Sequence, residues 1–199
     1  MNVYDELGSE YDRYRSEAGV RVVLDVVHEM GGGLHVMDLG CGTGHPIAVR
    51  VAPLVAKYFG IDNSEPMLSA FRGNVPEAEC CLLDMSNIET IGGTWDLIVS
   101  WGSLCHLSVD RQTSTLACAA RLLKTDGRLI FTGGKEPGQC KGSVGPHANV
   151  IDHYSMGKTE YKALLAANGM KELWAEAREA DNFTYLYKKM PNKSDALDG

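Results

Sequence analysis

The chain has 199 residues, of which 44% are apolar and 23% are charged, and its formal net charge is −7. This length and composition suit one globular domain with a sizeable core. The acidic balance argues against a nucleic-acid partner, because proteins that bind a phosphate backbone normally present a basic face. No apolar run approaches the ~18 residues that a membrane span needs, and the acidic, polar start of the chain does not resemble a signal peptide.

Six cysteines are spread along the chain. None forms a C-x-x-C pair, and none has the Cys/His spacing that is typical of zinc sites. We interpret them as scattered reduced thiols, which indicates a cytoplasmic protein. From this pattern we expect no metal site.

Apolar periodicity and turn residues divide the first half of the chain into alternating helices and strands. A repeat of the i, i+3, i+4, i+7 type predicts one face of an amphipathic helix, formed by Val20, Val23, Leu24 and Val27. The glycines at 31–33 end this helix. The expected helices are a solvated one within residues 1–18 and three more over about 20–30, from Pro46 to before Pro53, and over 65–72. Asn63 or Ser64 would cap the last of these, and Gly73 lies past its end. The expected strands span 34–39, 55–61, 79–83 and 95–100.

The second half continues the alternation up to a long irregular segment. Before the long segment we expect a helix from Asp110 to Lys124, a turn at Asp126-Gly127 and a strand over 128–132. The long segment itself is expected to be a loop over 133–152. After it we expect a helix that starts at Thr159 and ends at Gly169, and two strands over 171–177 and 182–188. A loop of that length inside a compact domain is usually functional or disordered. The last two strands are predicted to pair antiparallel at the edge of the sheet. Residues 191–199 are predicted to form a flexible tail.

Strand–helix alternation on this scale predicts an α/β fold with a doubly wound, mainly parallel sheet of seven strands. We expect a single domain over residues 1–190, with an N-terminal helical cap over about 1–30. Ligands in such sheets bind beyond the carboxyl ends of the strands. Asp38, Asp62, Asp84 and the segment 100–106 all follow predicted strands. The sequence therefore predicts a ligand site at that end of the sheet.

The stretch after the first predicted strand carries glycines at alternate positions: Gly40, Gly42 and Gly44. Such glycines allow a sharp backbone turn and bring a ligand close to main-chain amides. A dinucleotide fingerprint, G-x-G-x-x-G, would need a third glycine where His45 stands, and the lysine of a P-loop is also missing. A nicotinamide-dependent reductase is thus a weaker alternative.

Several stretches resemble, in order and spacing, the motifs of the class I S-adenosylmethionine-dependent methyltransferase family. They are Val36–Gly44, Gly60–Leu68, Leu83–Met85, Asp96–Ser100 and Leu122–Leu129. The similarity covers roughly residues 20–190, and it implies a Rossmann-like fold with S-adenosylmethionine as cofactor. By analogy with the family, Asp62 would bind the ribose hydroxyls, Asp84 would bind the adenine amino group, and the Met85 amide would bind a nitrogen of the adenine ring.

The resemblance also implies a wider set of cofactor contacts. The Gly40 carbonyl would hold the ammonium group, an aromatic side chain near the N-terminus would cover the cofactor, and Asp38 would serve mainly to orient the glycine turn. The expected cofactor-binding residues are Asp38, Gly40, Gly42, Gly44, Asp62, Asn63, Asp84, Met85, Ser100, Tyr11 and Tyr14.

The acceptor is expected to be a small molecule. The Asn-Pro-Pro-Tyr motif of base and glutamine methyltransferases is absent after the fourth predicted strand, where Ser100–Leu107 instead resembles small soluble members of the family. Methyl transfer is an in-line displacement that needs a base only for a protonated nucleophile. Histidine is the residue type whose ordinary pKa lies near neutral pH, so His106 and His153 are the candidate bases or substrate-orienting groups. Trp101 and Tyr154 are candidate substrate contacts.

Two questions stay open at this stage. A domain that binds S-adenosylmethionine or S-adenosylhomocysteine without turnover, as a sensor, is the alternative to an enzyme. The acceptor atom (oxygen, nitrogen, sulfur or carbon) and the choice between monomer and homodimer are not determined by these motifs. We expect no membrane partner.

Overall fold

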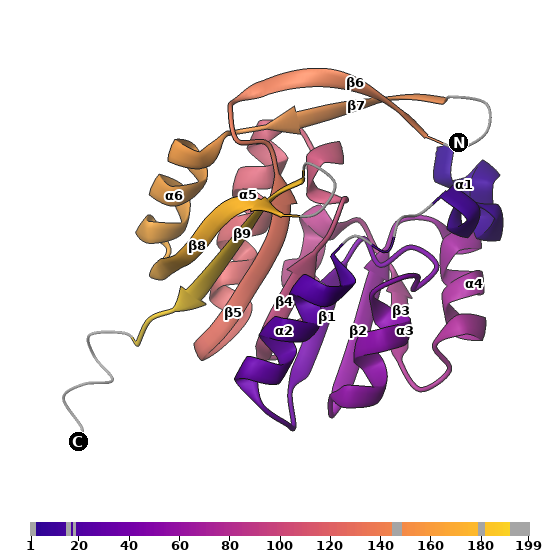
Figure 1. Cartoon of the computed structure of the whole chain (residues 1–199), viewed down its shortest axis with the longest axis horizontal. Coiled ribbons are helices and arrows are strands. Elements are labelled where there is room, and N and C mark those ends of the chain that lie inside the picture. The colour runs from indigo at the N-terminus through magenta and orange to yellow at the C-terminus, as the bar shows by residue number, and fades with distance from the viewer. Residues whose placement is uncertain (1–2, 15–16, 18, 145–148, 179–181, 192–199) are drawn as a thin grey trace.

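The computed structural model of the chain describes residues 3–14, 17, 19–144, 149–178 and 182–191. Its centre is a seven-stranded sheet in the order β3-β2-β1-β4-β5-β9-β8 (Figure 1). The strands are β1 (His35–Leu39), β2 (Lys57–Asp62), β3 (Glu79–Leu82), β4 (Trp95–Ser100), β5 (Leu123–Gly133), β8 (Met170–Arg178) and β9 (Asn182–Lys189). The first five run parallel, and β9 is antiparallel to both β5 and β8. The predicted fold class is therefore confirmed, including the antiparallel pair at the edge.

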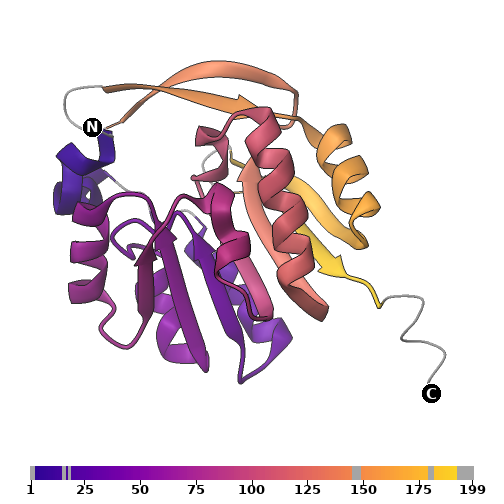
Figure 2. The same cartoon turned by 180° about the vertical axis from the view of Figure 1, so that it is seen from behind.

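Helices cover both faces of the sheet (Figures 1 and 2). One face packs against α2 (Val20–Met30), α3 (Ala48–Val51) and α4 (Glu65–Asn74), and the other against α5 (Val109–Leu122) and α6 (Lys158–Ala167). Successive strand residues contribute to opposite cores: Val36 belongs to the first and Met37 to the second. Both faces of β1 are buried, and Val36, Met37 and Leu39 supply its apolar contacts.

The α2 helix buries a broader face than its periodicity predicted. Its buried residues are Val22, Val23, Val26 and Val27, whereas Val20 and Leu24 lie at the rim and are only partly buried. Two valine pairs at i, i+4 give this helix a wide apolar contact with the sheet. The predicted contact through Val23 and Val27 is confirmed; Val20 and Leu24 pack at the rim of the same core, and the prediction missed Val22 and Val26.

Several element boundaries differ from the prediction for local reasons. Ser108, rather than Asp110, precedes α5, and this helix stops at Leu122 because Leu123 already pairs with Trp95 as part of β5. The turn expected at Asp126-Gly127 becomes an irregularity inside β5, with Asp126 at a φ of 66°. Three further boundaries differ from the prediction. The α4 helix includes Gly73 instead of ending before it, α6 begins at Lys158 instead of Thr159, and Pro53 lies inside a short helix, η2 (Ala52–Leu54).

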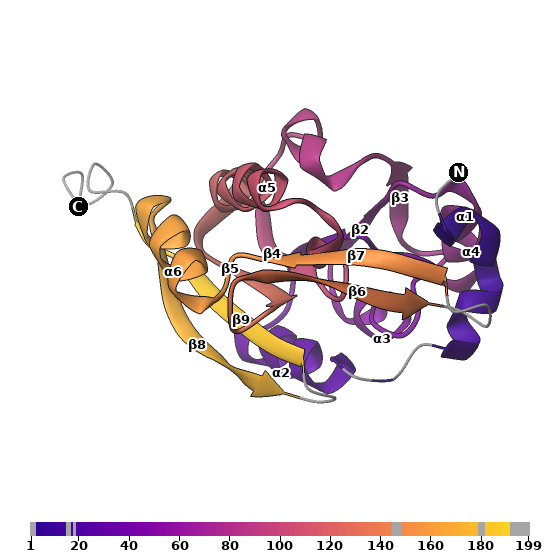
Figure 3. The same ribbon diagram turned by 90° about the horizontal axis from the view of Figure 1, so that it is seen from above.

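The predicted loop over residues 133–152 contains a β-hairpin, which corrects the prediction. Strands β6 (Gly138–Val144) and β7 (Asn149–Ser155) pair antiparallel, and residues 145–148 lie outside the described part. The hairpin is rich in glycine and polar residues, so its sequence carried only a weak strand signal. Figure 3 shows it crossing over the end of the sheet, away from the main strand ladder.

The N-terminal region divides into two parts. The predicted helix within 1–18 is a short helix α1 (Val3–Leu7) followed by the 3₁₀ helix η1 (Gly8–Tyr14), and both contact α4. The Thr43 hydroxyl donates a hydrogen bond to the Asp12 carboxylate, which attaches η1 to the glycine turn. The α2 helix packs instead on the sheet face, so only α1 and η1 lie where a cap over the site was expected.

The described part of the chain holds no helix that is both long and apolar enough to cross a lipid bilayer. All six cysteines are free thiols. Of the tail predicted for 191–199, residues 192–199 lie outside the described part, as does His147 of the predicted loop.

Replacing Tyr58 with phenylalanine should lower the free energy of unfolding by about 1–3 kcal/mol. The Tyr58 hydroxyl donates a 2.7 Å hydrogen bond to Oδ2 of the buried Asp38, and burial together with this carboxylate raises the pKa of the tyrosine well above its usual value. Urea denaturation measures the change. The control Tyr187→Phe removes a longer bond, 3.1 Å, to the partly exposed Glu172, and should cost less. Equal losses in both variants would contradict a special role for the Asp38 contact.

Candidate active site

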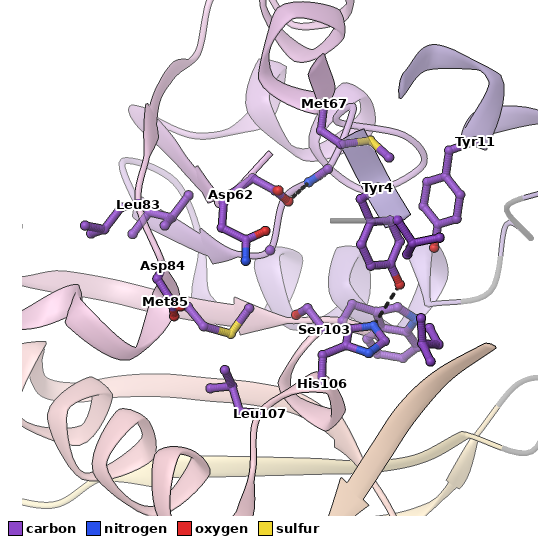
Figure 4. A pocket seen from close by; sticks show the side chains of 18 of the residues that line it. Tyr4, Tyr11, Asp62, Met67, Leu83, Asp84, Met85, Ser103, His106 and Leu107 are labelled. Carbon is purple, nitrogen blue, oxygen red and sulfur yellow. Dashed lines mark hydrogen bonds between the residues drawn. The ribbon is translucent and has the colours of Figure 1, made fainter. Parts of the chain in front are cut away.

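A pocket of about 510 Å³ lies beyond the carboxyl ends of β1, β2 and β4, and residues of the β6–β7 hairpin, α1 and η1 contribute to its lining (Figure 4). Its size falls within the range of about 300–1,000 Å³ that is usual for small-molecule sites. The residues that line it include Tyr4, Tyr11, Gly40, Gly42, His45, Asp62, Asn63, Met67, Leu83, Asp84, Met85, Trp101, Ser103, His106, Arg111, Asp152 and Tyr154.

The glycine turn forms the floor of this pocket. The amides of Gly40 and Cys41 both donate to the Ile61 carbonyl, at 2.7 and 3.0 Å, so the turn is fastened to the end of β2. A Cβ on Gly40 would lie 2.4 Å from the Ser103 Cβ, whereas a Cβ on Gly42 would meet nothing within 4 Å. Gly40 therefore permits close packing against the segment after β4, and Gly42 leaves the floor open.

Asp62 presents a carboxylate at the end of β2. Its Oδ2 accepts a hydrogen bond from the Gly42 amide at 2.8 Å, and its Oδ1 accepts one from the Ser64 amide at 3.0 Å. Burial raises the pKa of Asp62, although these amide bonds act in the opposite direction. The carboxylate is thus held rigidly in a poorly solvated position, where an additional hydroxyl donor would interact with it strongly.

Asp84 is part of a polar cluster at the start of η3 (Met85–Thr90). Its Oδ1 accepts hydrogen bonds from the amide and the hydroxyl of Ser86, both at 2.9 Å, and its Oδ2 forms an ion pair with Arg111 of α5. Burial alone raises the pKa of Asp84, but the Ser86 and Arg111 contacts outweigh it, so this pKa lies below its usual value. Sequence reasoning missed Arg111, because nothing in the α5 pattern separates it from a solvated charge.

The wall between the two acids is apolar. Met67, Leu83 and Met85 side chains lie around Asp62 and Asp84 in Figure 4, and all three line the pocket. An apolar slot with a carboxylate at each end suits a flat, polar-edged ring joined to a hydroxylated group.

The opposite end of the pocket carries ionisable rings. Oη of Tyr4 lies 2.9 Å from Nε2 of His106, as the dashed line in Figure 4 shows, and the Tyr4 ring meets the edge of Tyr11 at 5.4 Å between centroids. The ring of His153, from β7, lies 5.0 Å from that of His106. Tyr4 was not among the predicted site residues; the aromatic-rich N-terminus was its only sequence signal.

Trp101 and Tyr154 both line the pocket, from different elements. Trp101 is only 5% exposed, and a Cβ on Gly19 would lie 2.1 Å from its Cε2, so most of the indole packs in the core. Tyr154 is on β7, and its hydroxyl lies 3.4 Å from Nε2 of Gln139. Trp101 thus offers an edge to the pocket rather than a full stacking face.

The other predicted site residues lie behind the lining. The buried Asp38 accepts the Tyr58 hydroxyl, Gly44 packs against Val75 and Phe71, and the Ser100 hydroxyl lies 2.8 Å from that of Ser103. These residues shape the turn and the β4 end from outside the described pocket. His153 reaches the site through its contact with His106, and the side chain of Tyr14 lies outside the described part.

A doubly wound sheet with this pocket at its topological switch point defines a Rossmann-like ligand-binding protein. Residues 36–127 match the family model described as "Methyltransferase domain". YqeM of Bacillus subtilis (strain 168) is 32% identical over 137 residues, which are 65% of this chain and 52% of that protein. Nocamycin O-methyltransferase of Saccharothrix syringae is 32% identical over 143 residues, 68% of this chain and 48% of that enzyme.

Solved structures share the fold over nearly the whole chain. CalS10, an amino pentose methyltransferase from Micromonospora echinaspora solved with S-adenosylmethionine bound, superposes with a TM-score of 0.71 at 16% identity, covering 96% of this chain and 98% of that one. Over residues 36–127 the chain matches a methyltransferase domain, and its fold and motifs are similar to those of the class I S-adenosylmethionine-dependent methyltransferases. It spans about half the length of the curated relatives it matches.

Proposed function

We propose that this chain transfers a methyl group from S-adenosylmethionine to a small-molecule acceptor by in-line displacement. The observation that carries the proposal is that one pocket joins two chemically different ends. One end has the Asp62 carboxylate, an apolar slot and an open glycine floor; the other has His106, Tyr4 and Tyr154. The first suits a nucleoside with a charged tail, and the second suits a polar acceptor.

The residues at the first end fit the cofactor. Asp62 is positioned to accept hydrogen bonds from the ribose hydroxyls, and Met67, Leu83 and Met85 provide apolar contacts for the adenine ring. Gly42 leaves room for the methionine portion, because no atom lies within 4 Å of where its Cβ would be. Asp84, fixed by Arg111 and Ser86, would position η3 beside the ring. The sulfonium of the bound cofactor supplies the methyl group.

At the other end, alignment and exclusion of water are the main requirements of the reaction. Tyr4 and Tyr11 cover the pocket from the N-terminal side, and the β6–β7 hairpin covers it from above. His106 would orient the acceptor or accept its proton, with the Tyr4 hydroxyl at Nε2 holding the ring in place. His153 would support His106 from behind.

Relatives support the proposed class of acceptor. Nocamycin O-methyltransferase and the amino pentose methyltransferase CalS10 are both named for small molecules. The acidic net charge of −7 agrees with an acceptor that is not a nucleic acid. The oligomeric state and the cytoplasmic location stay predictions.

Calorimetric titration of the purified protein with S-adenosylmethionine, S-adenosylhomocysteine and a nicotinamide dinucleotide tests the cofactor. Binding of the first two without the third is expected, and binding of the dinucleotide alone would overturn the proposal. Consumption of the methyl donor in the presence and absence of a panel of small acceptors then separates an enzyme from a sensor. Tight binding without turnover on any acceptor class would favour the sensor.

Replacing His106 with alanine should leave the dissociation constant for S-adenosylmethionine within about twofold of the wild-type value and lower turnover by about 100-fold or more, because the ring is the proposed proton acceptor. His106 lies at the acceptor end of the pocket, on the side away from Asp62 in Figure 4. His28→Ala, on the exposed side of α2, is the matched control and should change neither quantity. Loss of cofactor affinity in His106→Ala would place this ring in the cofactor site or the core instead.

A further inference from the structure

We propose that Cys105, His106 and His153 form a binding site for a borderline-soft divalent cation, with Zn²⁺ the best fit, at the acceptor end of the pocket. One ligand atom from each of the three side chains, a thiol sulfur and two ring nitrogens, lies within 4.8 Å of the others. All three side chains are half-buried. The sequence predicted no metal, because neither the spacing of the cysteines nor that of the histidines suggested it.

The fold assembles this cluster from two elements that are distant in the chain. Cys105 and His106 belong to the 3₁₀ helix η4 (Leu104–His106), directly after β4, and His153 belongs to β7 of the hairpin. The hairpin strand contacts η4, and the two histidine rings lie 5.0 Å apart. Gly142 of β6 makes room for the His153 ring, since a Cβ there would lie 2.5 Å from its Cε1.

The donor set indicates the class of ion. One thiolate sulfur and two imidazole nitrogens are the ligands that Zn²⁺ and chemically similar ions prefer. With bonds of about 2.0–2.3 Å, tetrahedral ligand atoms lie roughly 3.5 Å apart, so the three atoms would need to approach by about 1 Å when an ion binds. Binding would convert the Cys105 thiol to a thiolate and release its proton to solvent. Tyr4, 2.9 Å from Nε2 of His106, is positioned as an outer partner that orients this ring.

Three protein ligands leave a fourth position open, as in catalytic zinc sites. His106 lines the pocket, so the open position would face the acceptor. An ion there would hold a hydroxyl or carboxylate oxygen of the acceptor and lower the pKa of a hydroxyl, and His106 would then act as a ligand instead of a base. This consequence rests on the proposed methyl transfer, whereas the binding of the ion does not.

Titration of the reduced full-length protein with Co²⁺, followed by visible absorption spectroscopy, tests the site. The expected result is one ion per chain, with the intense d–d bands of a tetrahedral ion and a sulfur-to-cobalt charge-transfer band, both removed by one equivalent of Zn²⁺. Cys105→Ser should lose the charge-transfer band, and His153→Ala should weaken binding at least tenfold. Cys140→Ser is the control, because Cys140 pairs with His153 across the hairpin but is exposed and outside the cluster; it should bind normally.

A second pair of variants tests the geometry without removing a ligand. Gly142→Ala would displace the His153 ring and should weaken Co²⁺ binding, whereas Gly138→Ala, on the same strand with nothing within 4 Å of the added Cβ, should leave it unchanged. Titration of each variant with S-adenosylmethionine measures its cofactor affinity, so that loss of metal binding can be distinguished from failure of the proposed function. The proposal is overturned if the wild type shows only octahedral, pale spectra, or if Cys140→Ser rather than Cys105→Ser abolishes the charge-transfer band.

Discussion

Replacing Gln112 with alanine is expected to lower the free energy of unfolding by about 3 kcal/mol or more, the largest effect of any single substitution considered for this chain. The side chain is fully buried, and its Nε2 donates hydrogen bonds of 2.9 Å to the carbonyls of Leu107 and Tyr154. Its Oε1 accepts a 2.7 Å bond from the Tyr161 hydroxyl. Gln112 thus joins α5, the segment after η4, the β7 strand and α6. Its loss leaves three polar groups without this hydrogen-bond partner: the Leu107 and Tyr154 carbonyls and the Tyr161 hydroxyl.

The same substitution should loosen the β6–β7 hairpin. Urea denaturation measures the loss of stability, and hydrogen exchange of the hairpin amides measures the local opening. Ser114→Ala is the matched control on α5, because the exposed Ser114 hydroxyl bonds only to carbonyls of its own helix, Asp110 and Arg111; its cost should be below about 0.5 kcal/mol. If Gln112→Ala costs no more than Ser114→Ala, the buried network does not hold the hairpin.

Replacing Asp62 with alanine should weaken binding of S-adenosylmethionine by about 1–3 kcal/mol, which is roughly 5- to 150-fold in the dissociation constant. The change removes the acceptor proposed for the ribose hydroxyls and also the partner of the Gly42 and Ser64 amides. Calorimetry measures the affinity. Glu65→Ala removes a nearby, exposed carboxylate that pairs with Arg72, and it should bind the cofactor normally. An unchanged dissociation constant in Asp62→Ala would exclude the assigned role.

The pH dependence of Asp62 gives an independent check. Because its folded-state pKa is raised, mainly by burial, its contribution to stability is fully present below the ordinary aspartate pKa of about 4 and is lost as pH rises through the raised pKa. Hydroxyl donors favour the ionised carboxylate, so wild-type affinity for the cofactor should fall as pH drops through the same window. Asp62→Ala should lack this dependence, and an identical pH profile in both proteins would contradict the assignment.

Local sequence patterns predicted the sheet well because the central strands β1 and β4 are buried on both faces, and apolar residues and turn glycines mark the strands. Of the three acids predicted at the strand ends, Asp62 and Asp84 line the pocket, whereas Asp38 is buried and does not line it. Their hydrogen-bond partners were not predictable. Arg111 reaches Asp84 from α5, and Tyr58 reaches Asp38 from a neighbouring strand, and such pairings depend on packing.

The hairpin shows where sequence reasoning fails. Its strands mix glycine, polar and exposed apolar residues such as Val150, and no face of the hairpin is marked by a clear apolar periodicity. The buried Gln112 of α5 holds the hairpin through a hydrogen bond from its side-chain amide to the Tyr154 carbonyl of β7. The residue pattern of α5 alone does not reveal this contact. The sequence therefore named His106, His153 and Tyr154 as candidates, but not how the hairpin brings them together.

By itself, the sequence determined the doubly wound sheet, the glycine turn after β1 and the resemblance to class I methyltransferases, because these depend on local spacing and on residues adjacent in the chain. Only the tertiary structure decided which side chains meet: Tyr4 with His106, and His106 and Cys105 with His153. The physical reason is that contacts between η4, the N-terminal helix and a polar hairpin depend on how packed elements cross, and no short-range periodicity records that.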